Sequence, residues 1–321
     1  MKKHLVLFAI LLLSLFAFAA NPTWTTPPKV HVAAFSVNDY SHYYQANLRK
    51  KSLQRSFFHK EMFIDSLFSR VARKYPEKDF RTTYNYRDED ASMDHYGSAQ
   101  LYHSEFVFFS GHGNQQKICL YDYPIITYSG CGRDVCPNDS VGKVYGGNTR
   151  WVIYDACLVL NVNKSDRLGS PLNAENVDLD KVDKLRTVFR GVHAILGFYS
   201  LSFEDYKYST KTGRFFQSEW LYDYFTQFFI EEGESIWDSF SMASAYVVYD
   251  YSFFGNRGLK PAIAFLRGYD EKGNFHDTSM ETFEHTFNQP IEITNTLELF
   301  VKYAEYGNPS FDSGDTTPIV F

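Results

Sequence analysis

Four short segments of this chain are apolar at nearly every position, and they constrain the fold more than any other feature of the sequence. They read KVHVAAFSV (29–37), EFVFFS (105–110), RWVIYD (150–155) and HAILGF (193–198). A strand that carries apolar side chains on both faces has to be covered on both faces, as in a parallel sheet between helical layers. Helical patterns lie between these segments. We therefore predict an α/β fold, a three-layer α/β/α sandwich with a mostly parallel central sheet.

The remaining elements follow from periodicity and turn residues. The clearest helix spans His59 to Tyr75, because its apolar residues recur at helical spacing and Pro76 ends it. Further helices are expected at 178–189, 215–230 and 235–249, and strands at 117–121 and 261–267. A hairpin turn at 271–274 leads to a partner strand near Phe275, and the tail adds a strand near Ile291 and a short helix from Leu297 to Tyr306. Residues 77–104 are expected to be a polar connection, and 122–148 a functional insertion.

The N-terminus has the features of a secretory signal. Lys2 and Lys3 precede an apolar stretch, and Ala17-Phe18-Ala19 is a typical cleavage signal, so the mature chain is expected to start at Ala20. The alternative is a membrane anchor, but the apolar stretch is short for a span. We predict a signal peptide (1–19), an N-terminal part of the α/β domain (20–104), a core (105–270), and a C-terminal hairpin and tail (271–321). The protein is expected to be secreted or periplasmic.

Charge and aromatic content narrow the partners. The net charge of −6 becomes about −8 once the two signal lysines are removed (−6 − 2), which disfavours nucleic acid as a partner. No later segment approaches the ~18 apolar residues of a membrane helix. Aromatic residues make up 18% of the chain, which indicates either a densely packed core or a sugar-binding surface, with the core favoured.

Two of the apolar strands end in residues that can do chemistry. EFVFFS is followed by Gly111-His112-Gly113, and RWVIYD by Ala156-Cys157. In parallel sheets, reactive groups collect beyond the carboxyl ends of the strands. We therefore predict that the strands ending at Ser110 and Asp155 are parallel neighbours, with His112 and Cys157 facing each other. A thiolate is a strong nucleophile, and a nearby imidazole can activate it or protonate a leaving group. The N–H groups of Gly113 and Cys157 could form an oxyanion hole. The alternatives are a buried structural thiol and a histidine that merely occupies a turn.

The blocks FVFFSGHGN and WVIYDACL, in this order and each at a strand end, resemble the caspase-like clan of cysteine peptidases. This clan includes caspases, metacaspases, legumains and gingipains, and the similarity extends over roughly residues 100 to 270. It implies a caspase-like core in which His112 is the catalytic histidine and Cys157 the nucleophile. The chain departs from many relatives after the cysteine, where Leu158-Val159-Leu160 replaces a small residue followed by Ser or Gly. The shape of that turn therefore stays open.

Several other residues are candidates for smaller roles. Asp155 could orient His112 or simply stabilise the turn, and Glu204 and Asp205 could favour a basic side chain before the scissile bond or form a solvated loop. Cys131 is expected to pair with Cys136 or Cys119, which leaves Cys157 reduced. Three carboxylates, Asp88, Asp90 and Asp94, suggest Ca²⁺ binding or, more simply, an exposed acidic loop.

These observations favour an exported cysteine endopeptidase that acts on polypeptide as a monomer, with no nucleic-acid partner and, after signal cleavage, no membrane partner. No cofactor is expected, with Ca²⁺ as the one alternative. The first competing function is a catalytically inactive exported caspase-like module that binds peptide or polysaccharide. The second is a glycosidase of a different fold with two carboxylates, which is weaker because no pair of carboxylates stands out at a strand end.

Overall fold

The structure, a computed structural model, describes residues 30–41, 52–76, 80–96, 104–115, 117–122, 124–126, 149–164, 173, 175–189, 191–202, 206–209, 214–249, 259–284, 293, 295–306, 313–315 and 319–320. The signal peptide predicted at 1–19 lies outside these residues. Within them, no helix combines the length and the apolar character that a bilayer crossing requires.

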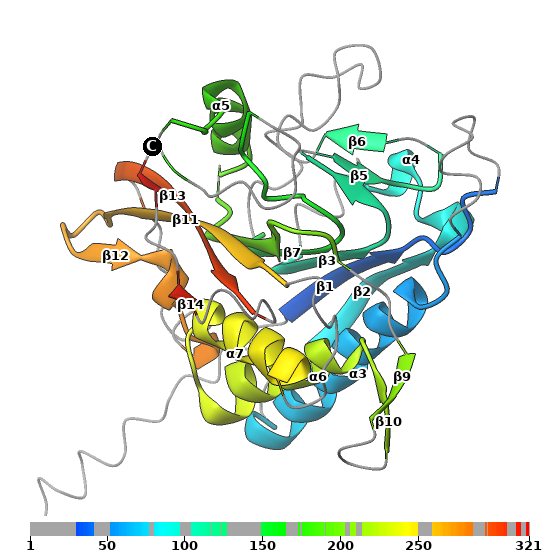
Figure 1. Cartoon of the computed structure of the whole chain (residues 1–321). Coiled ribbons are helices and arrows are strands. Elements are labelled where there is room, and N and C mark those ends of the chain that lie inside the picture. Colours follow the sequence, from blue (N-terminus) through cyan, green and yellow to red (C-terminus); the bar gives the residue numbers. More distant parts are fainter. Residues whose placement is uncertain are drawn as a thin grey trace, which may run out of the picture.

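A central sheet of ten strands, counted over the described residues, organises the molecule (Figure 1). The strand order is β14–β13–β11–β8–β7–β3–β1–β2, with β12 paired to β11 and β15 to β13. The strands are β1 (Val30–Ser36), β2 (Phe80–Arg87), β3 (Phe106–Ser110), β7 (Trp151–Asp155), β8 (Ala194–Phe198), β11 (Pro261–Tyr269), β12 (Phe275–Asp277), β13 (Asn295–Glu305), β14 (Ser313–Asp315) and β15 (Ile319–Val320). The neighbours from β2 to β8 are parallel, while β11 is antiparallel to β8 and to β13. The predicted mostly parallel sheet is confirmed.

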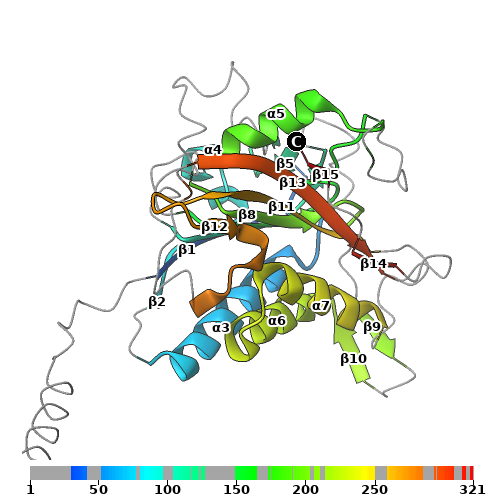
Figure 2. The ribbon, with the colours of Figure 1, turned by 90° about the vertical axis from the view of Figure 1, so that its left-hand side faces the viewer.

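Helices cover both faces of this sheet, which gives three layers (Figure 2). One layer contains α3, α6 and α7, and the opposite layer contains α5. The helical segments are α3 (Ser56–Lys74), α4 (Met93–Tyr96), α5 (Leu179–Val188), α6 (Trp220–Thr226), its continuation η4 (Gln227–Glu232), α7 (Ile236–Tyr249), and the short turns η1 (Asp88–Asp90) and η6 (Thr278–Met280). Two small sheets lie outside the main one: β4 (Gly113–Asn114) with β5 (Lys117–Cys119) and β6 (Pro124–Ile126), and β9 (Tyr206–Ser209) with β10 (Arg214–Gln217).

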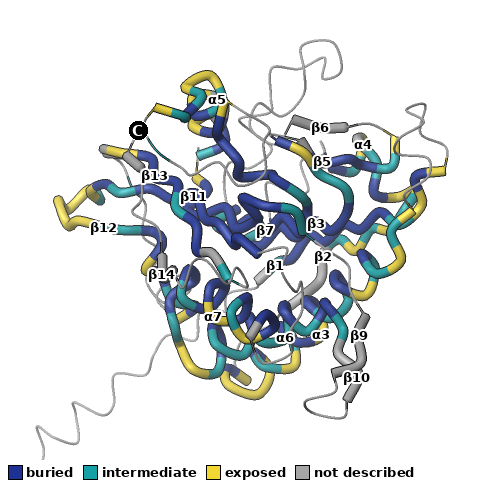
Figure 3. The backbone as a smooth tube through the Cα atoms, in the orientation of Figure 1, coloured by how far each residue is buried: buried dark blue, intermediate teal, exposed yellow. Residues whose placement is uncertain are grey.

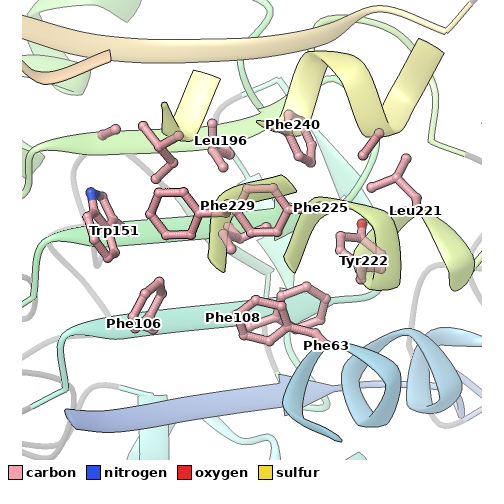
Figure 4. Packing of buried hydrophobic residues seen from close by; sticks show 14 of the residues in the cluster. Phe63, Phe106, Phe108, Trp151, Leu196, Leu221, Tyr222, Phe225, Phe229 and Phe240 are labelled. Atoms are coloured by element: carbon pink, nitrogen blue, oxygen red, sulfur yellow. The ribbon is translucent and has the colours of Figure 1, made fainter. Parts of the chain in front are cut away.

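The apolar strands supply side chains to two separate cores, as their sequences require. In β3, Phe106 and Phe108 pack under α3, α6 and α7, whereas Val107 and Phe109 join the core on the α5 side. Side chains alternate between the faces of a strand, so a strand buried on both sides is apolar throughout. The central strands are buried along their length, while the exposed residues lie on the outer helices and hairpins (Figure 3). Much of the large aromatic content lies in these cores, as predicted (Figure 4).

The sequence analysis predicted a short helix from Leu297 to Tyr306, and this prediction was wrong. The segment forms most of strand β13. Its side chains alternate between the two cores: Leu299 and Val301 enter one, and Phe300 enters the other. The pairing of β13 with β11 satisfies its backbone hydrogen bonds, and it is this tertiary contact that decides between a helix and a strand.

Two other expectations about elements were wrong. The segment 77–104, expected to be a connection, contains the parallel strand β2. Its sequence FRTTYNYR is polar because β2 is the edge strand of the described sheet and needs less apolar cover. The helix expected at 215–230 begins only at Trp220, after the hairpin strand β10. The strand expected near Ile291 falls on a residue outside the described part of the chain.

Phe63 of α3 allows a test of how strongly the helical layer is anchored. Its fully buried ring stacks on Phe108 of the sheet at 4.7 Å between ring centroids and on Phe225 of α6 at 6.5 Å. We expect Phe63→Ala to lower the free energy of unfolding by about 3–5 kcal/mol, because it leaves a cavity between helix and sheet. Phe58→Ala, at an exposed position of the same helix, should cost less than about 1 kcal/mol. Urea unfolding of both variants measures this, and equal losses would contradict it.

Glu105 lies at the opposite end of the strands from His112 and Cys157, and its carboxyl group has a raised pKa. Its side chain accepts a hydrogen bond of 2.6 Å from the backbone N–H of His31. Burial nevertheless raises the pKa of Glu105 to about 7, because that hydrogen bond and the nearby Arg150 do not offset the loss of solvent. Since this pKa lies above the unfolded value, the carboxyl group stabilises the fold fully below about pH 4.5, and this contribution disappears as the pH rises through 7.

We therefore expect Glu105→Gln to change the pH dependence of stability. A neutral amide does not ionise, so the variant should gain stability relative to wild type between pH 5 and pH 8, by about 1–3 kcal/mol. Urea unfolding at the two pH values gives this difference. Glu271→Gln, at an exposed hairpin residue, is the control and should show no such trend. Parallel stability curves for wild type and Glu105→Gln would refute the assignment.

Candidate active site

The carboxyl ends of three parallel strands are aligned at one edge of the sheet. Ser36 of β1 pairs with Ser110 of β3, and Ser110 pairs with Asp155 of β7. The ladder continues past the strands, since the N–H of Gly111 donates to the carbonyl of Asp155 at 3.1 Å. The strands that carry the histidine and cysteine blocks are therefore parallel neighbours in register, as predicted, and the residues that follow them meet at one rim.

Tyr40 holds the turn that carries His112. The phenol oxygen of Tyr40 accepts a hydrogen bond from the backbone N–H of His112 and donates one to the carbonyl of Cys119, both at 2.9 Å. The Tyr40 and His112 rings lie 4.7 Å apart between centroids. A second hydrogen bond joins the two arms of the turn, from the N–H of Cys119 to the carbonyl of His112 at 2.8 Å. Backbone and ring of His112 are thus both supported, and its partly buried side chain remains at the surface of the rim.

Gly113 brings the histidine turn against the cysteine turn. A Cβ atom at Gly113 would lie 2.7 Å from the Cβ of Ala156 and 3.0 Å from the carbonyl oxygen of Cys157. Both distances are too short for a side chain, so only glycine allows this approach of the two backbones. Gly111 is similarly restricted, because its Cβ would lie 2.6 Å from the phenol oxygen of Tyr40. The glycines on either side of His112 therefore have a steric reason that the sequence could only suggest.

Cys157 lies in a strained turn directly after β7. It is a partly buried thiol that is not in a disulfide, and its Sγ donates to the carbonyl of Ser202 at 3.3 Å. The next residue, Leu158, has φ +58°, a left-handed conformation that side chains other than glycine rarely adopt. Its N–H donates to the carbonyl of Ser200 at 2.8 Å, and its side chain is buried, which holds this conformation. The turn at Leu158 thus forms without a small residue, at a cost of about 1–2 kcal/mol in backbone strain.

Asp155 binds a different histidine from the one considered in the sequence analysis. Its carboxylate accepts hydrogen bonds from Ser110 at 2.6 Å and Ser202 at 2.9 Å, and contacts Nδ1 of His59 at 2.5 Å. Burial alone raises the pKa of Asp155, but the adjacent His59 and the hydrogen bond from Ser110 outweigh it and hold the pKa below its ordinary value. These buried contacts favour the structural role of Asp155 over the orientation of His112.

His59 is the residue of this region that sequence reasoning missed. Its Nε2 is 2.6 Å from the hydroxyl of Ser218, so Ser218, His59 and Asp155 form a chain of contacts with the distances of a serine-hydrolase triad. The three residues are only 3%, 2% and 5% exposed, so a substrate cannot reach the hydroxyl. The sequence contained a signal for this buried histidine. His59 and Lys60 lie one helical turn before the apolar residues Phe63 and Ile64, so they occupy the buried face of the helix although they are polar.

The other candidates have mixed outcomes. Cys119 is a buried thiol, so the proposed disulfide to Cys119 is not present, while Cys131 and Cys136 lie outside the described residues. Glu204 and Asp205 also lie outside them. A carboxylate oxygen of Asp88 accepts hydrogen bonds from the backbone N–H groups of Asn38 and Asp39, which gives that residue a structural role. Across the described part of the chain, no group of three or more His, Cys, Asp or Glu residues could hold a metal ion.

Comparisons with known proteins add structural similarities only. No protein-family model matches the chain, and no curated protein matches its sequence. The structure of the Drosophila initiator caspase Dronc is similar at 10% identity, with 70% of this chain and 74% of that chain covered and a TM-score of 0.31. The Arg-specific cysteine proteinase gingipain R is similar at 8% identity, with 90% of this chain and 66% of that one covered and a TM-score of 0.34.

A third similar structure is the complex of pro- and mature domains of a Porphyromonas gingivalis gingipain, at 8% identity, with 90% and 67% covered and a TM-score of 0.32. The chain thus spans about two thirds of the length of the gingipain chains. Caspases and gingipains both belong to the clan that the two sequence blocks resemble. The three-layer α/β/α arrangement of this chain is established by its own parallel strand order and by the two covered faces of the sheet.

The hydroxyl of Tyr40 offers a test of how His112 is positioned. Tyr40→Phe removes two buried hydrogen bonds but keeps the ring against His112, so we expect a loss of about 1–3 kcal/mol in the free energy of unfolding. Tyr96→Phe is a matched control, since that buried hydroxyl bonds to Tyr154 at 3.2 Å within the core. Urea unfolding compares their stabilities. The pH dependence of Cys157 alkylation should change in Tyr40→Phe alone, and an identical profile in both variants would contradict the positioning role.

Proposed function

We propose that this protein is an exported cysteine endopeptidase in which Cys157 is the nucleophile and His112 the general acid and base. The observation that best supports this is the contact between the histidine turn and the cysteine turn, where Gly113 lies against the backbone of Cys157 at the shared rim. A partly exposed thiol and a partly exposed imidazole on adjacent turns are the arrangement that nucleophilic catalysis requires.

The proposed reaction follows from these groups. His112 takes the proton of the Cys157 thiol. The resulting thiolate attacks the scissile carbonyl carbon and forms a carbon–sulfur bond, and the carbonyl oxygen takes the negative charge. The N–H groups of Gly113 and Cys157 stabilise that oxyanion. His112 then donates a proton to the leaving amine as the carbon–nitrogen bond breaks. Water, deprotonated by His112, hydrolyses the thioester and regenerates the thiol.

The substrate is proposed to be polypeptide, and no cofactor enters this mechanism. Secretion after removal of residues 1–19 is part of the proposal and rests on the sequence alone. Substrates with Arg or Lys before the scissile bond are the first to try, followed by Asn and Asp, because Glu204 and Asp205 follow the strand next to β7. Asp155 is excluded as a contact for that side chain, because its oxygens are buried and bound to His59, Ser110 and Ser202.

Replacing the nucleophile is the decisive experiment. Cys157→Ala should lower cleavage of a mixed peptide library at least about a thousandfold, because the covalent intermediate can no longer form. The melting temperature should change by no more than about 2–4 °C, since the side chain is only partly buried. His112→Ala should also abolish turnover, whereas His276→Ala, in the distant hairpin, should not.

The assays should include Ca²⁺ and limited proteolysis, in case the protein is made as a zymogen. Equal background cleavage by wild type and Cys157→Ala would refute the peptidase. It would leave the inactive caspase-like module that binds peptide or polysaccharide, which a glycan array and peptide-binding assays then examine. As a separate check on the thiol, iodoacetamide should label Cys157 faster than Cys119, which is buried.

A further inference from the structure

Ser202 connects the candidate nucleophile to the buried carboxylate of Asp155. Its backbone carbonyl accepts the hydrogen bond from Cys157 Sγ at 3.3 Å, and its hydroxyl donates to Oδ1 of Asp155 at 2.9 Å. Ser202, in the segment after β8, therefore contacts both the thiol of Cys157 and the carboxylate of Asp155. The position of the carbonyl that meets the thiol depends on what holds Asp155.

The carboxylate of Asp155 is held by side chains from several parts of the fold. Its other oxygen, Oδ2, receives the hydroxyl of Ser110 and contacts His59, and His59 is held in turn by Ser218. These partners come from β3, from α3 and from the segment before α6, so three parts of the fold meet at one buried carboxylate. The ring centroid of Tyr222 in α6 lies 5.6 Å from that of His59, so Tyr222 covers these residues on the side of the helices. The hydroxyl of Ser202 is thus tied to a fixed point.

The chemistry of the Ser202 contact favours one protonation state of the thiol. A carbonyl oxygen can accept a hydrogen bond from S–H, but it presents its negative end to a thiolate. The contact therefore stabilises the neutral thiol and disfavours its ionisation. Formation of the thiolate requires that either the Cys157 side chain or the Ser202 carbonyl moves.

We propose that Ser202, Asp155 and His59 are positioning residues that hold Cys157 in a protonated resting state. This rests on the proposed function and adds to it a form of regulation. When the carbonyl of Ser202 moves away from the thiol of Cys157, as on binding of a substrate, His112 can take the proton of that thiol. The network therefore disfavours ionisation of the nucleophile in the resting protein, and it forms no second catalytic centre.

Other titratable or charged groups surround this network, and their contributions have to be separated from it. They are His112 on the turn after β3, Tyr222 on α6 and the Arg55–Glu219 ion pair beside Ser218. The backbone N–H of Lys260 donates to the hydroxyl of Ser200, while its charged Nζ lies over the ring of Tyr303. A variant at Ser202 leaves every one of these side chains in place. It is also the least disruptive change, because Ser202 is partly exposed whereas Asp155 and His59 are buried.

The test is the pH dependence of Cys157 alkylation by iodoacetamide in the mature full-length chain, followed by mass spectrometry of the peptide that contains Cys157. In Ser202→Ala, the midpoint of the alkylation profile should move to lower pH. The rate at pH 7 should rise about 2- to 10-fold, the effect of one neutral hydrogen bond. Ser202→Thr keeps the hydroxyl and should retain the wild-type midpoint. Ser235→Ala, which loses a hydrogen bond at the start of α7, controls for a general loss of stability.

A midpoint that is unchanged in Ser202→Ala, or that moves to higher pH, overturns the proposal. An increase in rate by the same factor at every pH also overturns it, because that pattern reports easier access to the thiol and no change in its ionisation. These outcomes do not depend on peptide cleavage. If wild type and Cys157→Ala cleave peptides equally, the proposed function fails, and the alkylation profile still decides whether Ser202 restrains the thiol.

Discussion

The in-register parallel pairing of β3 with β7 is the constraint on which the rest of the site depends. Each residue of Phe106–Ser110 pairs with the corresponding residue of Trp151–Asp155, so the two chains leave the sheet at the same level. A shift by one residue would turn every side chain of one strand to the other face and bury polar groups. The two separate cores therefore fix the register, and the register in turn places the histidine and cysteine turns beside each other.

Beneath the edge of the sheet that carries His112 and Cys157, the region between the sheet and helix α3 is polar, which is unusual between a sheet and its covering helices. The buried group around Asp155 joins α3, β3 and the segment before α6 through side-chain hydrogen bonds. Buried polar groups are tolerated only where each has a partner, and such networks define geometry more sharply than apolar contacts do. Leu158, three residues after Asp155 in the chain, has a strained φ of +58°. Rigid support and backbone strain are both expected where a turn has to present one side chain in a defined direction.

The success of the sequence analysis followed the strength of the local signal. The four apolar strands, the helix ended by Pro76 and the hairpin near Phe275 were predicted correctly, because each has a pattern that one arrangement explains. The segment 297–306 failed because its apolar residues suit a helix and a two-faced strand equally well. The edge strand β2 was missed because its polar sequence FRTTYNYR resembles a surface connection. In both cases the neighbouring strand, which is distant in sequence, made the decision.

By itself, the sequence determined that a covered, mostly parallel sheet forms and that His112 and Cys157 each follow one of its strands. Those conclusions need only the continuous apolar character of the strands, their length, and the glycines and turn residues that follow them, which are local properties. Only the tertiary structure decided that β3 and β7 pair residue by residue without a shift, that Gly113 has no room for a side chain, and that the carboxylate of Asp155 binds His59 and Ser202. These contacts join residues up to 96 positions apart in the chain, and a periodic pattern does not reveal which distant residues pair. Their partners are selected by the packing of three layers, which no single segment encodes.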